Sequence, residues 1–338
     1  MSQPSPIWIS EADVVAMMDI GGAIDALEKG LQAEARGEAR NMVKTHVAWG
    51  DGATLHAIGA VFPNQEFAGT KTWAHTTGGA TPLLILFDSN NGSLRAIIEA
   101  FALGQLRTAG ASGVATRRLA AKDAADFAMI GTGKQALAQV AAVVAVRPIK
   151  RIRVFGRSGE RREHFIDRVR NEFGIETIGL DRITEAVSGA AIVTVATRAR
   201  EPIIMSEMIA SGAHINAIGA IVPNSAELAS DVLERCTQIV VDTVPAAQML
   251  SRELIDFFGP ADQEAWNQVR TLADVVADDQ ARHASDDVTL FKSLGMGISD
   301  LALGIELYRR ARAQNLGREF THPQKALPRL RRDVAQPA

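Results

Sequence analysis

The chain has 338 residues, 47% of them hydrophobic, a formal net charge of −3 and a single cysteine, Cys236. This length suits two domains with a sizeable core, and the small net charge excludes a global field that attracts nucleic acid or an anionic membrane. One cysteine forms no internal disulfide, and no cysteine cluster suggests a metal site. The N-terminus lacks the basic start and apolar run of a signal peptide, and no stretch approaches the roughly 18 to 20 apolar residues of a membrane span. We therefore expect a soluble cytoplasmic protein.

The first 120 residues combine short helices with strands and turns. Ser10 and Asp13 form a variant capping box before a short helix, and apolar residues at helical spacing predict a second helix that ends near Gly37. Short apolar runs broken by turn residues predict strands at 54–61, 69–75 and 83–88. Asn91-Gly92 is typical of a hairpin, and a helix rich in small residues is expected at 103–119.

From Asp126 the pattern changes to strands that alternate with helices. Continuous apolar runs predict strands at 127–131, 152–156, 175–179, 191–197, 214–219 and 238–242. Helices are expected between most of them, for example at 135–146 and 160–173, and this alternation is typical of a parallel, doubly wound sheet. After Asp242 we expect helices at 263–277 and 297–313, followed by a basic surface tail beyond Gly317.

A glycine-rich turn joins the first of these strands to the next helix. Gly131-Thr132-Gly133-Lys134-Gln135-Ala136 has the form G-x-G-x-x-A in a strand–turn–helix context. Gly131 permits the tight turn, Gly133 lets the backbone approach a pyrophosphate, and Ala136 lets helix and strand pack closely. The sequence therefore predicts a Rossmann unit that binds a dinucleotide, and the alternative is a tight turn without a ligand.

The end of the second strand usually discriminates between the two nicotinamide cofactors. An acidic residue there would bind the ribose 2′-hydroxyl of NAD, but this place holds Gly156, Arg157 and Ser158. With Arg161 close by, Arg157 and Ser158 can bind a 2′-phosphate, so NADPH is favoured over NADH. The alternative is a solvated basic turn.

Other segments join the glycine motif in one pattern: GTK (69–71), LFDSNNGSLRAII (86–98), LGQLRTAGASGVATRRLA (103–120), INAIG (215–219) and LFKSLGMGISDLA (290–302). Together they resemble the ornithine cyclodeaminase and mu-crystallin family over nearly the whole chain. The resemblance implies an enzyme that acts on small α-amino or α-imino acids, and a homodimer. It also implies an α/β fold with a Rossmann domain (121–296) inserted into an α+β substrate-binding and dimerisation domain (1–120 with 297–330), and a tail at 331–338.

Three cations match the carboxylate-binding residues of the family: Arg40, Lys71 and Arg107. Lys44 is an alternative to Arg40 for the same role. An α-carboxylate in a closed site needs charged, fixed donors, and Arg107 lies in an otherwise small and apolar helix. The alternative for each cation is a place on the surface. Further contacts with the cofactor are expected from Ala196, Thr197, Gly219 and Ser293.

Two positions depart from the cyclodeaminases. The aspartate that handles the substrate amine in those enzymes aligns with Ile221, and the acidic residue that recognises the distal amine aligns with His56. Both changes remove negative charge and argue against ornithine. The remaining carboxylate clamp suits an imino acid, with Lys71 or His56 as the proton donor. His56 and His75 would suit a second carboxylate, which favours a dicarboxylic imine such as iminosuccinate.

We therefore expect an NAD(P)H-dependent imine reductase or amino-acid dehydrogenase. One alternative is a cyclodeaminase that recycles bound NAD, and Ile221 argues against it. The other is a protein that only binds NADPH and a small ligand, and the intact set of cations argues against it.

Overall fold

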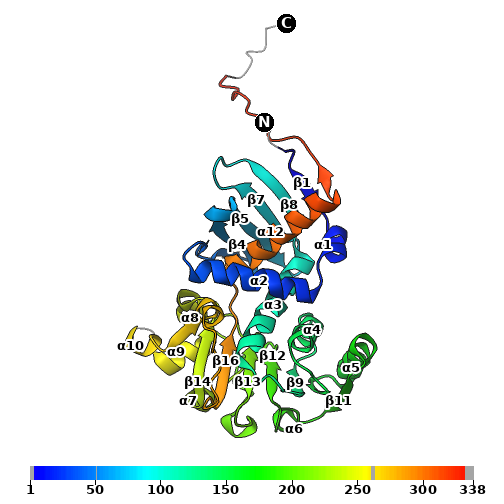
Figure 1. The fold of residues 1–338 in the computed structure, drawn as a ribbon, viewed down its shortest axis with the longest axis vertical. Coiled ribbons are helices and arrows are strands. Elements are labelled where there is room, and N and C mark those ends of the chain that lie inside the picture. Colours follow the sequence, from blue (N-terminus) through cyan, green and yellow to red (C-terminus); the bar gives the residue numbers. More distant parts are fainter. Residues whose placement is uncertain (1–3, 51, 260–262, 332–338) are drawn as a thin grey trace.

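The computed structural model describes residues 4–50, 52–259 and 263–331, which build two sheets that lie one beyond the other along the long axis (Figure 1). The first sheet has the order β17-β1-β8-β7-β5-β4-β2, with β3 paired to β4 and β6 paired to β5. Its strands are β1 (Ile7–Ile9), β2 (Arg40–Asn41), β3 (Thr45–Trp49), β4 (Ala53–Phe62), β5 (Phe67–Thr76), β6 (Gly79–Ala80), β7 (Leu83–Asp88), β8 (Leu94–Glu99) and β17 (Arg318–Glu319). β1 and β8 are parallel, whereas β4, β5, β7 and β8 form antiparallel pairs in turn.

One face of this sheet is covered by helices. They are α1 (Glu11–Met17), α2 (Ile20–Ala35), α3 (Phe101–Leu119) and α12 (Gly297–Gln314). A short 3-10 helix, η1 (Pro63–Gln65), connects β4 to β5. The capping box predicted at Ser10 and Asp13 is confirmed at the start of α1. Helix α12 returns from the far end of the chain and crosses the sheet (Figure 1), where Ile298 N–H donates to Asn41 Oδ1 at 2.9 Å. The opposite face carries exposed apolar side chains, among them Val47 and Leu55, which are paired across β3 and β4.

The second sheet has the order β11-β10-β9-β12-β13-β16-β14-β15, and all its pairs are parallel. Its strands are β9 (Asp126–Ile130), β10 (Arg151–Phe155), β11 (Glu176–Leu180), β12 (Ile192–Val195), β13 (His214–Ala217), β14 (Cys236–Val241), β15 (Val269–Thr271) and β16 (Val288–Lys292). The accompanying helices are α4 (Ala136–Val146), α5 (Gly159–Phe173), α6 (Ile183–Val187), η2 (Ser206–Met208), α7 (Ser230–Glu234), α8 (Val244–Leu250), α9 (Arg252–Phe258), α10 (Gln263–Trp266) and α11 (Leu272–Ala277). The six strands predicted between 127 and 242 are therefore confirmed, and so is the parallel, doubly wound sheet.

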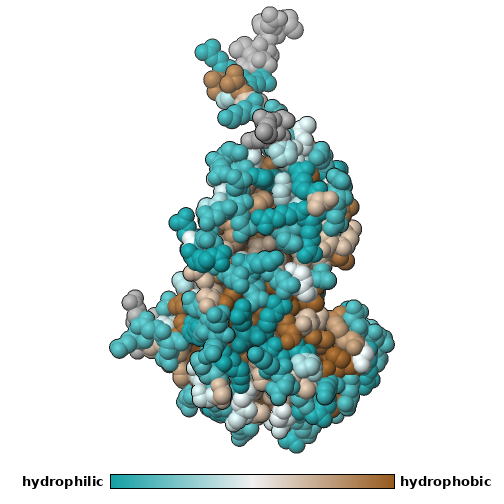
Figure 2. All heavy atoms as spheres, viewed as in Figure 1, coloured by the Kyte–Doolittle hydropathy of each residue, from teal (hydrophilic) through white to brown (hydrophobic). Residues whose placement is uncertain are grey.

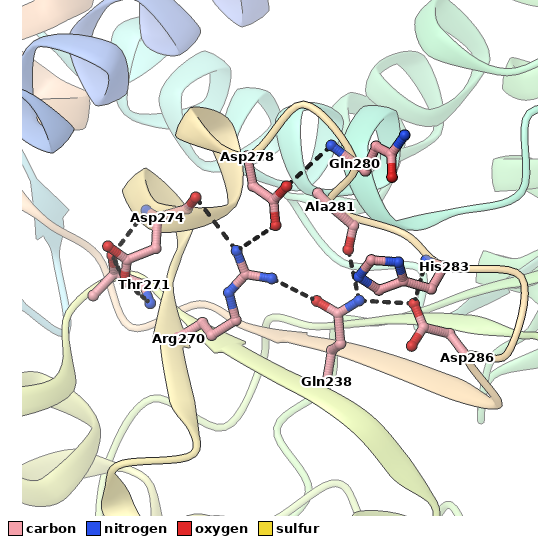
Figure 3. A network of polar contacts seen from close by, with 9 residues as sticks. All are labelled: Gln238, Arg270, Thr271, Asp274, Asp278, Gln280, Ala281, His283 and Asp286. Atoms are coloured by element: carbon pink, nitrogen blue, oxygen red, sulfur yellow. Dashed lines mark hydrogen bonds and ion pairs between the residues drawn. The ribbon is translucent and has the colours of Figure 1, made fainter.

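The prediction of one helix over 263–277 is wrong, and the strand at 288–292 was not predicted. Thr271 forms a capping box with Asp274, so α11 begins only after the short strand β15. The connection to β16 is fixed by a polar network (Figure 3). Gln238 Nε2 donates to Ala281 O at 2.6 Å, and Arg270 donates to Gln238 Oε1 at 3.1 Å and to Asp278 Oδ2 at 2.9 Å. β16 then lies between β13 and β14, and all five of its residues are buried.

Helix α3 links the two sheets. Its C-terminal carbonyls accept hydrogen bonds from the second part of the chain, with Arg147 Nη2 at 2.8 Å from Ala120 O and Arg282 Nη1 at 2.5 Å from Leu119 O. Asn216 on β13 donates to Thr116 Oγ1 at 2.9 Å. These contacts fix α3 relative to the parallel sheet. No helix in the described residues is long and apolar enough to cross a membrane.

Candidate active site

A buried cluster of charges lies between the first sheet and α12. Lys71 on β5 and Asp300 on α12 are 4% and 0% exposed, and Lys71 Nζ lies 2.5 Å from Asp300 Oδ1. Arg107 on α3 approaches the same oxygen, with Nε at 3.5 Å. The structure thus brings together Lys71 and Arg107, which the sequence predicted as substrate ligands. Asp300 was missed, although an acidic residue within the apolar helix GISDLALG is a signal that could have found it.

The cluster contains lysines with lowered pKa values and buried polar atoms without hydrogen-bond partners among the described residues. Burial lowers the pKa of Lys71 to about 8, and the charges of Arg107 and Lys44 act in the same direction, whereas Asp300 opposes them. Burial, followed by the charge of Arg107, also lowers the pKa of Lys44. Arg107 Nε and Asp300 Oδ2 are buried and make no hydrogen bond among the described residues. Because an unpaired buried polar group is unfavourable, a bound carboxylate that accepts from Arg107 Nε would stabilise the site, and Asp300 Oδ2 can accept from a donor on the same ligand.

The assignment of Arg40 to the substrate carboxylate is not supported by its position. β2 pairs Arg40 with Val61 and Asn41 with Ala60, so alternation along the strand points these two side chains to opposite faces. Asn41 bonds to α12, whereas Arg40 is exposed and lines a hollow on the other face of the sheet with Thr70 and Phe87. Of the two competing candidates, Lys44 is the one whose charge acts on Lys71.

An aromatic wall continues from Lys71 along the same face of the sheet. Lys71 Nζ lies 5.1 Å from the centre of the Trp73 ring, which stacks on His56 at 4.7 Å. The His56 ring stacks in turn on His46 at 5.6 Å. Burial lowers the pKa of His56, and the nearby charge of Lys44 lowers it further. His75 lies on β5 two residues beyond Trp73 and is exposed.

The glycine turn has the shape expected of a phosphate-binding turn. Gly131 has φ +107°, and a Cβ on it would lie 2.5 Å from Ala196 O, so only glycine fits. The position of a Cβ on Gly133 meets no heavy atom within 4 Å, which leaves open space at the start of the 11-residue helix α4. Gln135 and Ala136 begin that helix. The residues present therefore fit a pyrophosphate at a helix N-terminus.

Three residues in and after the turn that follows β10 were predicted to bind the cofactor, and two of them are accessible to it. Arg157 and Arg161 are exposed. The Ser158 hydroxyl accepts from Arg161 N–H at 3.4 Å and caps α5, so its oxygen is partly engaged. Arg162 is occupied by Asp181, with Nη2 at 2.8 Å from Oδ1.

The four further residues predicted to contact the cofactor lie at the same edge of the sheet. Ala196 and Thr197 follow β12, Gly219 follows β13, and Ser293 follows β16. The Ser293 hydroxyl donates to Asp242 Oδ2 at 3.2 Å and is 3% exposed.

The charge cluster adjoins this edge. Asp242 also accepts the backbone N–H groups of Leu294 and Gly295 and so shapes the turn after β16. A Cβ on Gly295 would lie 3.1 Å from Arg107 Nη1, so this turn contacts the guanidinium. The cations are therefore next to the carboxyl ends of the parallel strands, where open α/β sheets bind their ligands.

A cavity of about 870 Å³ opens between α4 and α5, where apolar side chains gather in Figure 2. It reaches Thr132 and Gly133 and is lined by Arg161 and His164. None of the cations near Lys71 lines it, so it belongs to the phosphate side of the glycine turn and not to the reacting centre. The described residues hold no group of three or more His, Cys, Asp or Glu side chains that could bind a metal ion.

Comparison with known proteins places this geometry among nicotinamide-dependent enzymes. The ornithine cyclodeaminase/mu-crystallin family profile matches residues 7–315. A Δ1-pyrroline-2-carboxylate reductase of Bacillus cereus is 31% identical over 271 residues, which cover 78% of this chain and 80% of that protein. The structure of a Thermococcus litoralis Δ1-pyrroline-2-carboxylate reductase in complex with NADH and L-proline matches with a TM-score of 0.85 and 26% identity, over 93% of this chain and 100% of the other. An archaeal alanine dehydrogenase dimer with bound NAD matches with a TM-score of 0.86 and 26% identity, over 94% and 99%.

Proposed function

The chain belongs to the ornithine cyclodeaminase/mu-crystallin family, and from that premise we propose that it reduces a small α-imino acid (ketimine) to an α-amino acid with NAD(P)H. The observation that carries the proposal is the buried cluster of Lys71, Arg107 and Asp300 beside the carboxyl ends of the parallel strands. The family, the fold class and the imine-reducing class of enzyme predicted from the sequence are confirmed. The roles of individual residues are our proposal.

Lys71 and Arg107 hold the substrate carboxylate, with Lys44 in the place predicted for Arg40. When bound, the reduced nicotinamide supplies a hydride to the carbon of the C=N bond. Lys71, whose pKa is about 8, carries a proton at neutral pH and donates it to the imine nitrogen, so the product is an amine. Asp300 holds Lys71 by a 2.5 Å contact and fixes the direction of its donor. His56, half-buried and acted on by the charge of Lys44, is the second candidate donor.

We further propose that the substrate carries a second carboxylate. Lys44, Lys71 and Arg107 are the cations of the cluster, and Asp300 and Asp242 are the carboxylates that act on Lys44. Because the α-carboxylate pairs with Lys71 and Arg107, Lys44 and the His56 wall remain to bind a second anionic group. A second carboxylate directed toward Lys44 and the His56 wall suits this arrangement, and iminosuccinate is the simplest such imine.

NADPH is the proposed cofactor, with NADH as the alternative. The relatives support a nicotinamide dinucleotide in general, because solved structures of similar proteins contain NADH or NAD. The preference for NADPH is supported by the exposed Arg157 and Arg161 beside Gly156, where no carboxylate repels a 2′-phosphate.

A homodimer is also proposed, through the face of the first sheet that no helix covers. Val47, Trp49 and Leu55 on this face are 59%, 47% and 45% exposed, and such a patch marks a protein interface. The alanine dehydrogenase with a similar fold is a dimer.

We also propose that the chain is divided into one domain of 1–120 with 297–330 and a second, inserted domain of 121–296.

The test is consumption of reduced cofactor by the purified protein. Oxaloacetate or pyruvate is mixed with ammonia or methylamine, and the absorbance of NADPH is followed. We expect stoichiometric oxidation of NADPH and formation of the amino acid, with the oxaloacetate imine preferred. No oxidation with any imino acid would refute the reductase, and a preference for the pyruvate imine would refute the second carboxylate alone.

A further inference from the structure

Glu227 is a buried carboxylate that the proposed reaction does not use. It is 0% exposed and lies between the loops that follow β12 and β13. Its Oε1 accepts from the backbone N–H and the hydroxyl of Thr197 at 2.7 and 2.8 Å. Its Oε2 accepts from the N–H groups of Gly219 and Ala220 at 2.8 and 3.1 Å. One side chain therefore joins both loops.

The position of Glu227 is itself fixed. Its carbonyl accepts from the N–H groups of Ile203 and Ile204, both at 3.0 Å. Its own N–H donates to Glu253 Oε1 at 2.9 Å, and Lys292 Nζ donates to the same oxygen at 3.0 Å. Lys292 is 1% exposed, and its positive charge lowers the pKa of Glu227, which burial raises. The carboxylate is thus an anchored, compensated group and not a mobile surface charge.

Only an acceptor fits between the two loops. Backbone N–H groups donate and cannot accept, and three of the four partners of Glu227 are such groups. The loops also touch each other, because a Cβ on Gly219 would lie 2.1 Å from Thr197 O and 2.4 Å from Glu227 Oε1. An amide at position 227 would direct an NH₂ group at one of the loops and push it away.

The two loops lie on one side of the glycine turn. In the sheet, β10 borders β9 on one side, and β12 followed by β13 borders it on the other. The turn after β10 carries Arg157, the residue proposed for the ribose phosphate at the adenosine end. The opposite side leads through the loops after β12 and β13 to Ser293, whose N–H donates to Ala217 O at 3.1 Å, and then to Arg107. The nicotinamide end of a dinucleotide must therefore extend over the loops that Glu227 joins.

We propose that Glu227 is a positioning residue for the nicotinamide half of the cofactor. By holding Thr197, Gly219 and Ala220 in one arrangement, it presents the loop that continues into Ile221 to the ring and leaves the adenosine half to the glycine turn. This inference rests on the proposed function, because it assumes a nicotinamide cofactor.

The experiment compares two ligands on Glu227→Gln without any imino acid. NADPH contains both halves of the cofactor, and 2′-phospho-ADP-ribose lacks the nicotinamide ring. We expect the variant to bind NADPH about tenfold more weakly, in line with the loss of hydrogen bonds to a charged group, and to bind 2′-phospho-ADP-ribose as the parent does. Asp88→Asn is the matched control, because Asp88 accepts from the N–H groups of Asn90 and Asn91 in a hairpin of the other sheet. It should leave both affinities unchanged.

Equal weakening of both ligands, or no weakening of either, would overturn the proposal, since a merely structural role does not separate the two halves. If Glu227→Gln does not fold, Glu227→Asp keeps the charge but is too short to reach both loops, and it should show the same split in smaller degree. The measurement needs no turnover, so it can be read even if the protein reduces no imine. If the parent binds neither NADPH nor NADH, the proposed function is refuted instead.

Discussion

Replacing Arg107 by leucine should abolish most turnover and leave cofactor binding intact. The Arg107 side chain is 20% exposed and shares Asp300 with Lys71, so its charge lies largely out of water. Truncating one partner of a buried charge pair costs about 2–5 kcal/mol. At about 1.4 kcal/mol per factor of ten, this corresponds to a decrease in kcat/KM of roughly 30- to 4,000-fold.

The assay follows NADPH absorbance with a preformed imino acid, and a separate titration measures the Kd of NADPH. Arg118→Leu is a matched control on the same helix, because Arg118 pairs with Glu28 at 2.5 Å and not with the cluster. It should lower the melting temperature while kcat/KM stays near the parent value. If Arg107→Leu keeps kcat/KM within threefold of the parent, the clamp has been assigned to the wrong residue.

Three further predictions concern protonation and cofactor choice. Since Lys71 must be protonated to donate and its pKa is about 8, kcat/KM for reduction should fall as pH rises above about 8, and Lys71→Met should lose this dependence. Arg157→Ala should weaken NADPH about fivefold, the scale of an exposed charge pair, while calorimetry shows NADH unchanged; equal affinities of the parent for both cofactors would contradict this. Burial raises the pKa of Glu34 from 4.5 to about 7, so between these pH values the folded protein binds a proton that the unfolded chain does not. The free energy of unfolding therefore decreases as pH rises through this range, and the loss is complete above about pH 7. Glu34→Gln should therefore raise the melting temperature at pH 8 but not at pH 5, and an equal change at both would refute the assignment.

Local patterns were sufficient for the cofactor half of the molecule. The glycine turn, the strands and the helices between 126 and 242 each depend on residues within about 20 positions of one another, and sequence periodicity reports such short-range order. The parallel sheet also contains β15 and β16, which the sequence did not predict. β15 has three residues between two helices, too few to establish a period, and β16 is a short apolar run that periodicity alone does not distinguish from a buried helix.

The substrate half depended on pairings that only a folded sheet creates. Lys71 and Asp300 are separated by 229 residues, so no local pattern joins them. Residue type alone does not say to which face a side chain points, so the sequence did not separate Arg40 from Lys44. The register of Arg40 with Val61 places the Arg40 side chain on the face opposite Asn41, since a shift by one residue reverses the face. The stack of His46, His56 and Trp73 likewise requires three strands in register.

The same geometry predicts that the protein does not convert ornithine to proline with NAD, despite the family name. Ile221 is 41% exposed on the loop after β13, where its side chain can neither transfer a proton nor pair with the substrate amine. The distal ammonium would meet Lys44 and His56, and the carboxylates that act on Lys44 already have partners. Asp300 is paired with Lys71 and Arg107, and Asp242 accepts from the backbone N–H groups of Leu294 and Gly295.

An unpaired ammonium in such a place costs several kcal/mol. Ile221→Asp alone should therefore not create good turnover, because the distal amine remains unpaired. Proline is measured chromatographically after incubation with ornithine and NAD. Reduction of a C=N bond needs only a held carboxylate, a hydride and one proton, which this site can supply without an acid at position 221. Proline formation by the parent at roughly 1 per second or faster, a rate typical of enzymes, would therefore contradict both the alignment at Ile221 and the assignment as a reductase.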